Sequence, residues 1–226
     1  MPITITRKTV VLTENLKSGL IDLAQQKISQ IHEFVSTGGT LHASSPALMN
    51  CKKILEWDDQ LQTRLRCLDI CKLDVIEAAY SKFVGYGGEA KTEKGSLLYF
   101  LTRDIQITDE KGRPWSLGPY HCYVPFANLL NGMASDFHFI PARNPKFLAR
   151  HPHHKAYRDN GSDNPLLFNP STCWGGFNSI IFPIIGDLDI VDLIRHILIY
   201  LSRYDPNSPL VHNPMSTITF IKQVMP

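Results

Sequence analysis

Apolar residues recur at helical spacing through the first third of the chain. After Thr13 they return every three to five positions, with lysine, glutamine and glutamate between them: Leu16, Leu20, Leu23, Ile28, Ile31, Phe34 and Val35. Thr13 has the side chain of a good N-cap and Gly38-Gly39 ends the pattern, so the spacing predicts a helix between them. A second helical pattern extends over residues 46–84 and is expected to break near Asp58-Asp59.

The pattern changes to that of strands after a glycine-rich stretch at residues 85–88. Apolar and aromatic residues then alternate or cluster in short runs, which predicts strands at residues 97–101, 105–108, 120–126 and 137–140. Weaker alternation predicts a short strand near each end of the chain, at residues 4–12 and 218–221.

Prolines and glycines punctuate the next stretch, so residues 141–179 are expected to form a loop. An amphipathic pattern then predicts a helix over residues 188–204, capped by Asp187 or Asp189 and ended by Asp205-Pro206. Residues 180–201 are the most apolar stretch, but Pro183 and charged residues interrupt it. We therefore expect buried protein core there rather than a membrane span.

The order of elements is helices, strands, loop and helix, which predicts an α+β fold. The chain has 226 residues, of which 43% are hydrophobic, enough for one large domain with an extension. We assign residues 1–70 to an N-terminal strand and helical extension, and residues 71–226 to the main domain.

The composition limits which partners and which cellular compartment we expect. The net charge of +2 provides no strong basic field, so we expect no nucleic acid partner. The N-terminus lacks the apolar core of a signal peptide, and we expect no membrane association. The five cysteines show no disulfide-scaffold spacing, which favours a reducing, cytoplasmic location.

The most reactive residues gather between His151 and Gly176. His151-Pro152-His153-His154 is followed by Cys173-Trp174-Gly175-Gly176. A thiol attacks as the thiolate, two glycines leave room for a bulky acyl group, and an imidazole N–H can donate to a developing oxyanion. We therefore predict that Cys173 is a catalytic nucleophile, with His153 and His154 as oxyanion donor or general base.

Simpler interpretations of the same residue types stay open. A free cysteine is most often a small buried hydrophobe, and we expect this of the four that lie in helical or strand patterns: Cys51, Cys67, Cys71 and Cys122. The histidines could belong to a polar surface loop. Together with Cys173 they could also bind zinc, but no Cys-x-x-Cys or His-Glu-x-x-His motif accompanies them, and we expect neither a metal nor another cofactor.

The motifs around this window resemble those of the ubiquitin-conjugating enzymes. That family carries a His-Pro-Asn motif shortly before its catalytic cysteine, and here His151-Pro152-His153 stands in that place, preceded by Asn144-Pro145. After the last predicted helix, Asp205-Pro206-Asn207-Ser208-Pro209-Leu210 is similar to a second family segment. The resemblance covers roughly residues 75–214. The chain departs from the family in three places. His153 stands where the family has asparagine, and the interval before Cys173 is longer, with residues 157–169 resembling an insertion. Trp174 directly follows the cysteine, whereas the family's tryptophan lies a few residues beyond it.

The resemblance implies an antiparallel β-meander packed with helices, in a divergent and bacterial member of the family. Cys173 would receive a ubiquitin-like protein from an activating enzyme as a thioester and pass it to an amine of a protein substrate, while His151 would be structural. Residues 1–70 lie outside the resemblance and could dock a partner. A non-catalytic binding module of the same fold, or an unrelated Cys/His thiol hydrolase, are the alternatives.

Overall fold

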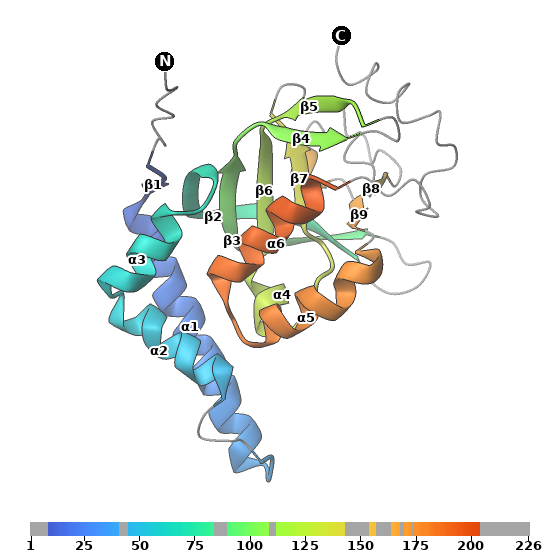
Figure 1. Cartoon of the computed structure of the whole chain (residues 1–226). Helices are drawn as coiled ribbons and strands as arrows, with labels where there is room; N and C mark the ends of the chain where they lie inside the picture. Colours follow the sequence, from blue (N-terminus) through green and yellow to red (C-terminus); the bar gives the residue numbers. More distant parts are fainter. Residues whose placement is uncertain are drawn as a thin grey trace.

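A five-stranded sheet forms the centre of the protein (Figure 1), with strand order β1-β2-β3-β6-β7. The computed structural model describes residues 9–40, 45–83, 90–108, 112–142, 154–156, 164–167, 170–172 and 174–203. The strands of the sheet are β1 (Val11–Leu12), β2 (Ile70–Phe83), β3 (Ala90–Thr102), β6 (Tyr120–Pro125) and β7 (His138–Pro141). β1 runs parallel to β2, and the other neighbours are antiparallel, so the sheet is mixed.

Helices and two smaller strand pairs surround this sheet. The helices are α1 (Glu14–Ser36), α2 (Pro46–Glu56), α3 (Asp59–Arg66), α4 (Phe126–Leu130), α5 (Asn178–Gly186) and α6 (Ile190–Leu201). β4 (Ile105–Thr108) pairs with β5 (Pro114–Gly118), and β8 (His154–Ala156) with β9 (Pro170–Thr172). Two 3-10 turns are η1 (Pro165–Leu167) and η2 (Gly175–Phe177). The predicted α+β class is confirmed.

The first helix starts where its sequence predicts, and its start is tied to the sheet. The Thr13 side chain accepts a hydrogen bond from the Leu16 N–H at 3.3 Å, and its hydroxyl donates to the Asp74 carboxylate on β2. Lys72 Nζ lies 3.0 Å from the same carboxylate. Burial alone would raise the pKa of Asp74, but the hydrogen bonds from Thr13, Lys72 and the Val75 N–H together lower it. The Thr13 side chain thus hydrogen-bonds both to an N–H at the start of α1 and to the buried carboxylate of Asp74.

One continuous core joins the N-terminal helices to the sheet and to α5 and α6. Leu16, Leu20 and Leu23 of α1 are fully buried, and they share this core with residues of α2, α3, β2 and α6. Gly19 faces the sheet at the closest point, where a Cβ atom would lie 2.7 Å from Val75 Cγ1. The assignment of residues 1–70 to a separate extension stays a prediction.

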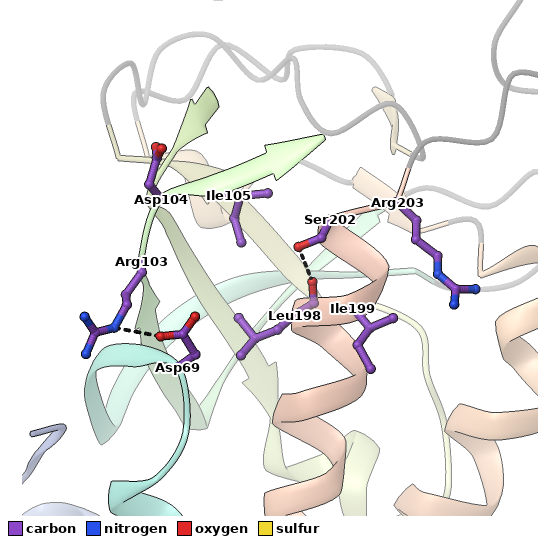
Figure 2. A pocket seen from close by; sticks show the side chains of 8 residues that line it. All are labelled: Asp69, Arg103, Asp104, Ile105, Leu198, Ile199, Ser202 and Arg203. Atoms are coloured by element: carbon purple, nitrogen blue, oxygen red, sulfur yellow. Dashed lines mark hydrogen bonds and ion pairs between the residues drawn. The ribbon is translucent and has the colours of Figure 1, made fainter. Parts of the chain in front are cut away.

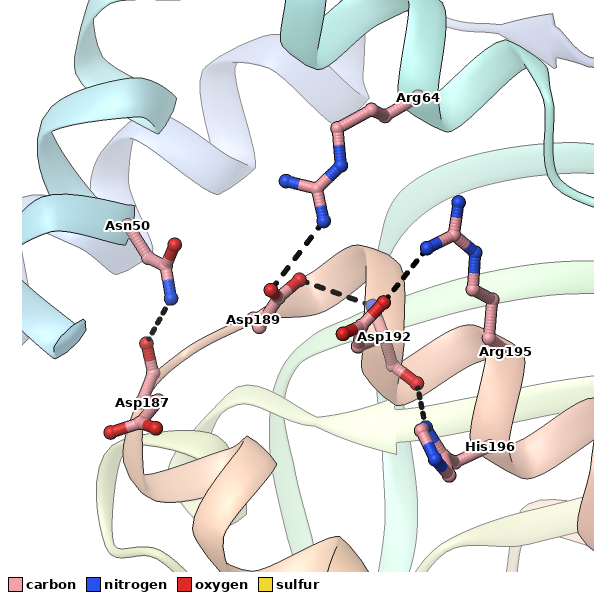
Figure 3. A network of polar contacts seen from close by, with 7 residues as sticks. All are labelled: Asn50, Arg64, Asp187, Asp189, Asp192, Arg195 and His196. Carbon is pink, nitrogen blue, oxygen red and sulfur yellow. Dashed lines mark hydrogen bonds and ion pairs between the residues drawn. The ribbon is translucent and has the colours of Figure 1, made fainter.

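Polar contacts also attach α2 and α3 to the turn between α5 and α6 (Figure 3). The Asn50 side-chain amide donates to the Asp187 carbonyl at 2.9 Å, and Arg64 lies 3.5 Å from the Asp189 carboxylate. Asp189 is the N-cap of α6, because it also accepts from the Asp192 N–H at 3.1 Å. Asp189 therefore caps α6 and also pairs with Arg64 of α3.

The second face of the sheet carries a smaller core. It consists of Tyr80, Leu97, Ile140 and Leu166, and Leu166 comes from η1. The Ser81 hydroxyl on β2 donates to the Leu167 carbonyl, which holds η1 on this face. Both faces of the central strands are therefore covered over part of their length.

Two sequence predictions in this region are wrong. The helical pattern over residues 46–84 ends at Arg66, and residues 70–83 form β2. β2 is buried on both faces, as at Leu73 and Asp74, so its apolar residues do not alternate and cannot be distinguished from a helix by periodicity. The predicted loop over residues 141–179 is wrong at its end, because α5 begins at Asn178. The core predicted to follow it is present, with Ile181 and Ile185 of α5 buried, although Ile180 and Phe182 are 43% and 45% exposed.

The other strand predictions at residues 97–101, 105–108, 120–126 and 137–140 are confirmed, and only β3, which starts at Ala90, begins well before its predicted start. The predicted strand near the C-terminus lies outside the described residues, and of residues 4–12 the described part contains β1. Within the described ranges, no helix combines the length and apolar character needed to cross a bilayer.

The contact between Gly19 and Val75 generates a stability prediction. Gly19→Ala gains about 1 kcal/mol of helix propensity but forces a methyl group into the β-branched Val75, and overpacking of this kind costs about 1–3 kcal/mol. We expect a net loss in the free energy of unfolding, measured by urea denaturation. Gly186→Ala is the matched control, because a Cβ there meets no atom within 4 Å, and it should be neutral or stabilising. A Gly19→Ala variant as stable as Gly186→Ala would contradict the close packing of α1 on β2.

Candidate functional site

The strand pair β8–β9 places His154 opposite a close sequence neighbour of Cys173. His154 is the first residue of β8, and its partner across the pair is Thr172, the residue that precedes Cys173 in the sequence. His151, His153 and Cys173 themselves lie outside the described residues. The backbone of His154 therefore pairs with the residue immediately before Cys173, despite the long interval between them in the sequence.

Both sequence neighbours of Cys173 are hydrogen-bonded to the segment that leads into β7. The Thr172 hydroxyl donates to the Phe137 carbonyl at 3.3 Å. The Trp174 indole N–H donates to the Ala134 carbonyl at 2.7 Å. These two contacts attach the chain on either side of Cys173 to residues 134–137.

The Trp174 ring fills an aromatic cluster between β7 and α6. It is 6% exposed, and its centroid lies 5.6 Å from Phe137, 6.2 Å from Phe139 and 4.6 Å from Tyr200. The two phenylalanines meet it edge-on, at interplanar angles of 87° and 89°, an arrangement favoured by the ring quadrupoles. The residue after Cys173 is thus fixed in the main core.

The backbone beyond Trp174 is open. Gly175 and Gly176 are exposed, and a side chain added at either would meet no atom within 4 Å. Gly175 also has a φ of 51°, in the left-handed region where glycine is favoured. Neither η2 nor α5 has a side-chain cap, and η2 runs directly into α5: the Phe177 N–H donates to the Trp174 carbonyl at 2.8 Å and the Asn178 N–H to the Gly175 carbonyl.

Residues 134–137 are themselves held by Asn128, a residue that the sequence analysis did not identify. Asn128 is fully buried in α4, and its amide donates to the Ser135 carbonyl and lies 3.3 Å from the Ser135 hydroxyl. The Ser135 hydroxyl lies 3.0 Å from the Asp136 carboxylate, and Asp136 has a φ of 57°. The only signal for Asn128 in the sequence is an amide within an apolar stretch, which by itself points to no particular role.

His138 of β7 was also missed. Its ring is fully buried and meets Tyr80 edge-on with a centroid distance of 6.2 Å. Neither ring nitrogen has a hydrogen-bond partner among the described residues. Burial therefore lowers the pKa of His138 to about 4, an effect that the nearby backbone of Ser81 opposes only in part.

The expectation that the other cysteines are buried holds for two of them. Cys51 and Cys122 are buried, and burial raises the pKa of both thiols. Cys67 and Cys71 are exposed, so the expectation is wrong for them. Cys67 is the C-cap of α3 rather than a residue within a long helix, and Cys71 lies at an irregularity in the pairing of β2 with β3.

A pocket of about 330 Å³ lies between the end of α6 and the start of β4 (Figure 2). Ile105, Leu198 and Ile199 supply its apolar wall, and Arg103 at its edge pairs with Asp69 at 2.9 Å. Among the described residues, the lining comes from the segments before β2 and β4 and from the end of α6, so the pocket gives no support to the candidate site.

Metal binding has no support in the part of the chain that the structure describes, where no group of three or more histidine, cysteine, aspartate or glutamate residues is suitably placed. Three residues of the zinc alternative, His151, His153 and Cys173, lie outside that part. Comparison with known proteins yields no matching family model, no matching curated protein and no matching solved structure. The interpretation of the site therefore depends on its own residues and geometry.

The buried imidazole of His138 generates a prediction for stability against pH. The unfolded chain binds a proton near pH 6.5, whereas the folded protein does so only near pH 4, so the free energy of unfolding falls as the pH drops between these values. A difference of this size corresponds to a loss of about 3 kcal/mol. We expect His138→Leu to flatten the profile measured by urea denaturation from pH 7 to 4. Substituting the exposed His32 with glutamine is the control, and parallel profiles for wild type and His138→Leu would contradict the assignment.

Proposed function

We propose that the protein is a ubiquitin-conjugating-like enzyme, which carries a ubiquitin-like protein as a thioester on Cys173 and transfers it to an amine of a protein substrate. The observation that carries the proposal is the pairing of His154 with Thr172. It supports a site in which the histidine motif and the cysteine act together despite their distance in the sequence.

The arrangement of the elements supports the same family-like architecture. β2, β3, β6 and β7 are antiparallel neighbours; among the described residues three helices precede them, α4 lies between β6 and β7, and α5 and α6 follow Cys173 in the sequence. We take this order as a UBC-like meander packed with helices. The free thiols of Cys67 and Cys71 fit a reducing compartment, and we place the enzyme in the cytoplasm of a bacterium.

The chemistry needs a nucleophile, an oxyanion donor and space. The Cys173 thiolate attacks the thioester carbonyl of the modifier held by an activating enzyme, a C–S bond forms, and the activating enzyme's thiolate leaves. An acceptor amine then attacks the new thioester, the Cys173 thiolate leaves, and a base removes the ammonium proton. His153 and His154 supply the N–H donor or the base, and the exposed Gly175 and Gly176 leave room for the extended C-terminus of the modifier.

The proposal predicts a reducing-agent-sensitive adduct. Incubated with ATP, an activating enzyme and the ubiquitin-like protein that this enzyme charges, the wild type should gain the mass of one modifier on a non-reducing gel and lose it with a thiol. Cys173→Ser should form only a thiol-resistant ester or no adduct. Single His153→Ala and His154→Ala variants should slow discharge to an amine, by up to roughly 10²-fold for the residue that binds the oxyanion.

Cys67→Ser and Cys71→Ser are the matched controls, because both remove an exposed thiol and should leave the adduct intact. A labile adduct that persists in Cys173→Ser would overturn the assignment of the nucleophile. Non-covalent capture of the modifier without any adduct would favour a binding module of the same fold, and thiol-dependent hydrolysis without an activating enzyme would favour a hydrolase.

A further inference from the structure

We propose that the solvent-facing side of α5 is an interface at which two copies of this protein associate about a two-fold axis. The α5 patch consists of Ile180, Phe182, Pro183 and Ile184. Ile180 and Phe182 are 43% and 45% exposed, Pro183 is exposed and Ile184 is half-buried. The proposed function makes no use of this patch, so the inference is independent of it.

The first observation is that α5, which packs beside α6 (Figure 1), is apolar on every side. Its polar residues, Asn178 and Ser179, both lie in its first turn. Ile181 and Ile185 are fully buried in the main core, and at 3.6 residues per turn Pro183 lies on the opposite side of the helix. A helix that is apolar all round is normally buried all round. The outer side of α5 therefore requires an apolar partner.

The second observation is that the α5 patch contains no charge. Between Trp174 and Gly186 the sequence has no charged residue. The next helix is different, because α6 carries an ion pair of Asp192 with Arg195, whose side chains are 39% and 48% exposed. Adjacent exposed apolar residues without charges, with an aromatic ring among them, are typical of the core of a protein interface.

The third observation identifies a second copy of the chain as the occupant. A two-fold interface places the same patch on both sides, so the patch must be complementary to itself, and an uncharged apolar surface meets this requirement. The ends of α5 carry opposite charges. The Arg203 guanidinium lies 5.2 Å from the ring of Phe177, which precedes α5, and Asp187 follows its last residue. In an antiparallel pair of α5 helices, Arg203 of each copy faces the acidic end of the other.

A membrane surface fits the α5 patch less well. A helix that lies on an anionic bilayer is normally bordered by lysine and arginine. The residues that follow α5 instead include three carboxylates, those of Asp187, Asp189 and Asp192. A second copy, whose own patch is uncharged, meets no such repulsion.

The size of the α5 patch sets the strength of the association. A standard interface buries about 800 Å² and roughly 20–30 residues on each partner, far more than the patch and its neighbours provide. We therefore expect a reversible dimer with a Kd of roughly 1–100 μM, rather than a permanent one.

Sedimentation velocity of the full chain, from about 1 to 300 μM, tests the proposal. The wild type should pass from monomer to dimer over this range. Ile180→Asp and Phe182→Asp bring two like charges together across the two-fold axis and should raise the Kd by at least roughly 100-fold. Ile199→Asp is the matched control, because Ile199 has the same side chain and is 42% exposed on α6, and it should leave the Kd unchanged. Arg203→Glu should raise the Kd by up to roughly tenfold.

A wild type that stays monomeric at every concentration overturns the proposal, including one that instead co-sediments with phosphatidylglycerol vesicles. A dimer that Ile199→Asp weakens as much as Ile180→Asp overturns the location on α5, and an unchanged Kd in Arg203→Glu overturns the antiparallel orientation. Hydrogen exchange of the wild type decides the matter if circular dichroism shows that a variant is unfolded. Protection of residues 178–186 should rise with protein concentration, and a dimer without this rise refutes the proposed interface.

Discussion

The burial of the Trp174 indole is the interaction on which the candidate site depends. The short strand pair β8–β9 would be marginal by itself, since a two-stranded ribbon buries too little surface to persist in water. The indole adds an apolar surface of about 150–250 Å² packed against Phe137, Phe139 and Tyr200, which corresponds to an upper bound of roughly 4–6 kcal/mol. Its N–H is satisfied by the Ala134 carbonyl, so this burial leaves no polar group unpaired.

How much of this could be read from the sequence depended on whether the signal was local. The Thr13 cap, the apolar stripe of α1 and an aspartate cap for α6 at Asp187 or Asp189 were predictable, because helix capping and amphipathic spacing involve only a few neighbouring residues. β2 was not predictable, since burial on both faces removes the alternation that identifies a strand. α5 was missed because Pro183 lies inside it and residues 180–185 are all apolar, which leaves no polar face to reveal helical spacing.

The candidate site also has a part that the sequence predicts and a part that it does not. The sequence alone identifies Cys173 and the histidines as reactive residue types in one window. It does not indicate that His154 pairs with Thr172, because the register of a strand pair is set by partners remote in the chain. Asn128 and His138 carry no local pattern either, and their character follows entirely from what surrounds them in the folded protein.

The parallel pairing of β1 with β2 has a consequence for the order in which the protein can be made. Val11 and Leu12 pair with Lys72 and Leu73, so the N-terminal strand and the apolar face of α1 lack their partner until β2 has been synthesised. In a nascent chain that ends before β2, Leu16, Leu20 and Leu23 can pack only against α2 and α3, and the side of their core that the sheet covers stays open. The N-terminal strand and helices therefore complete their packing only after β2 has left the ribosome.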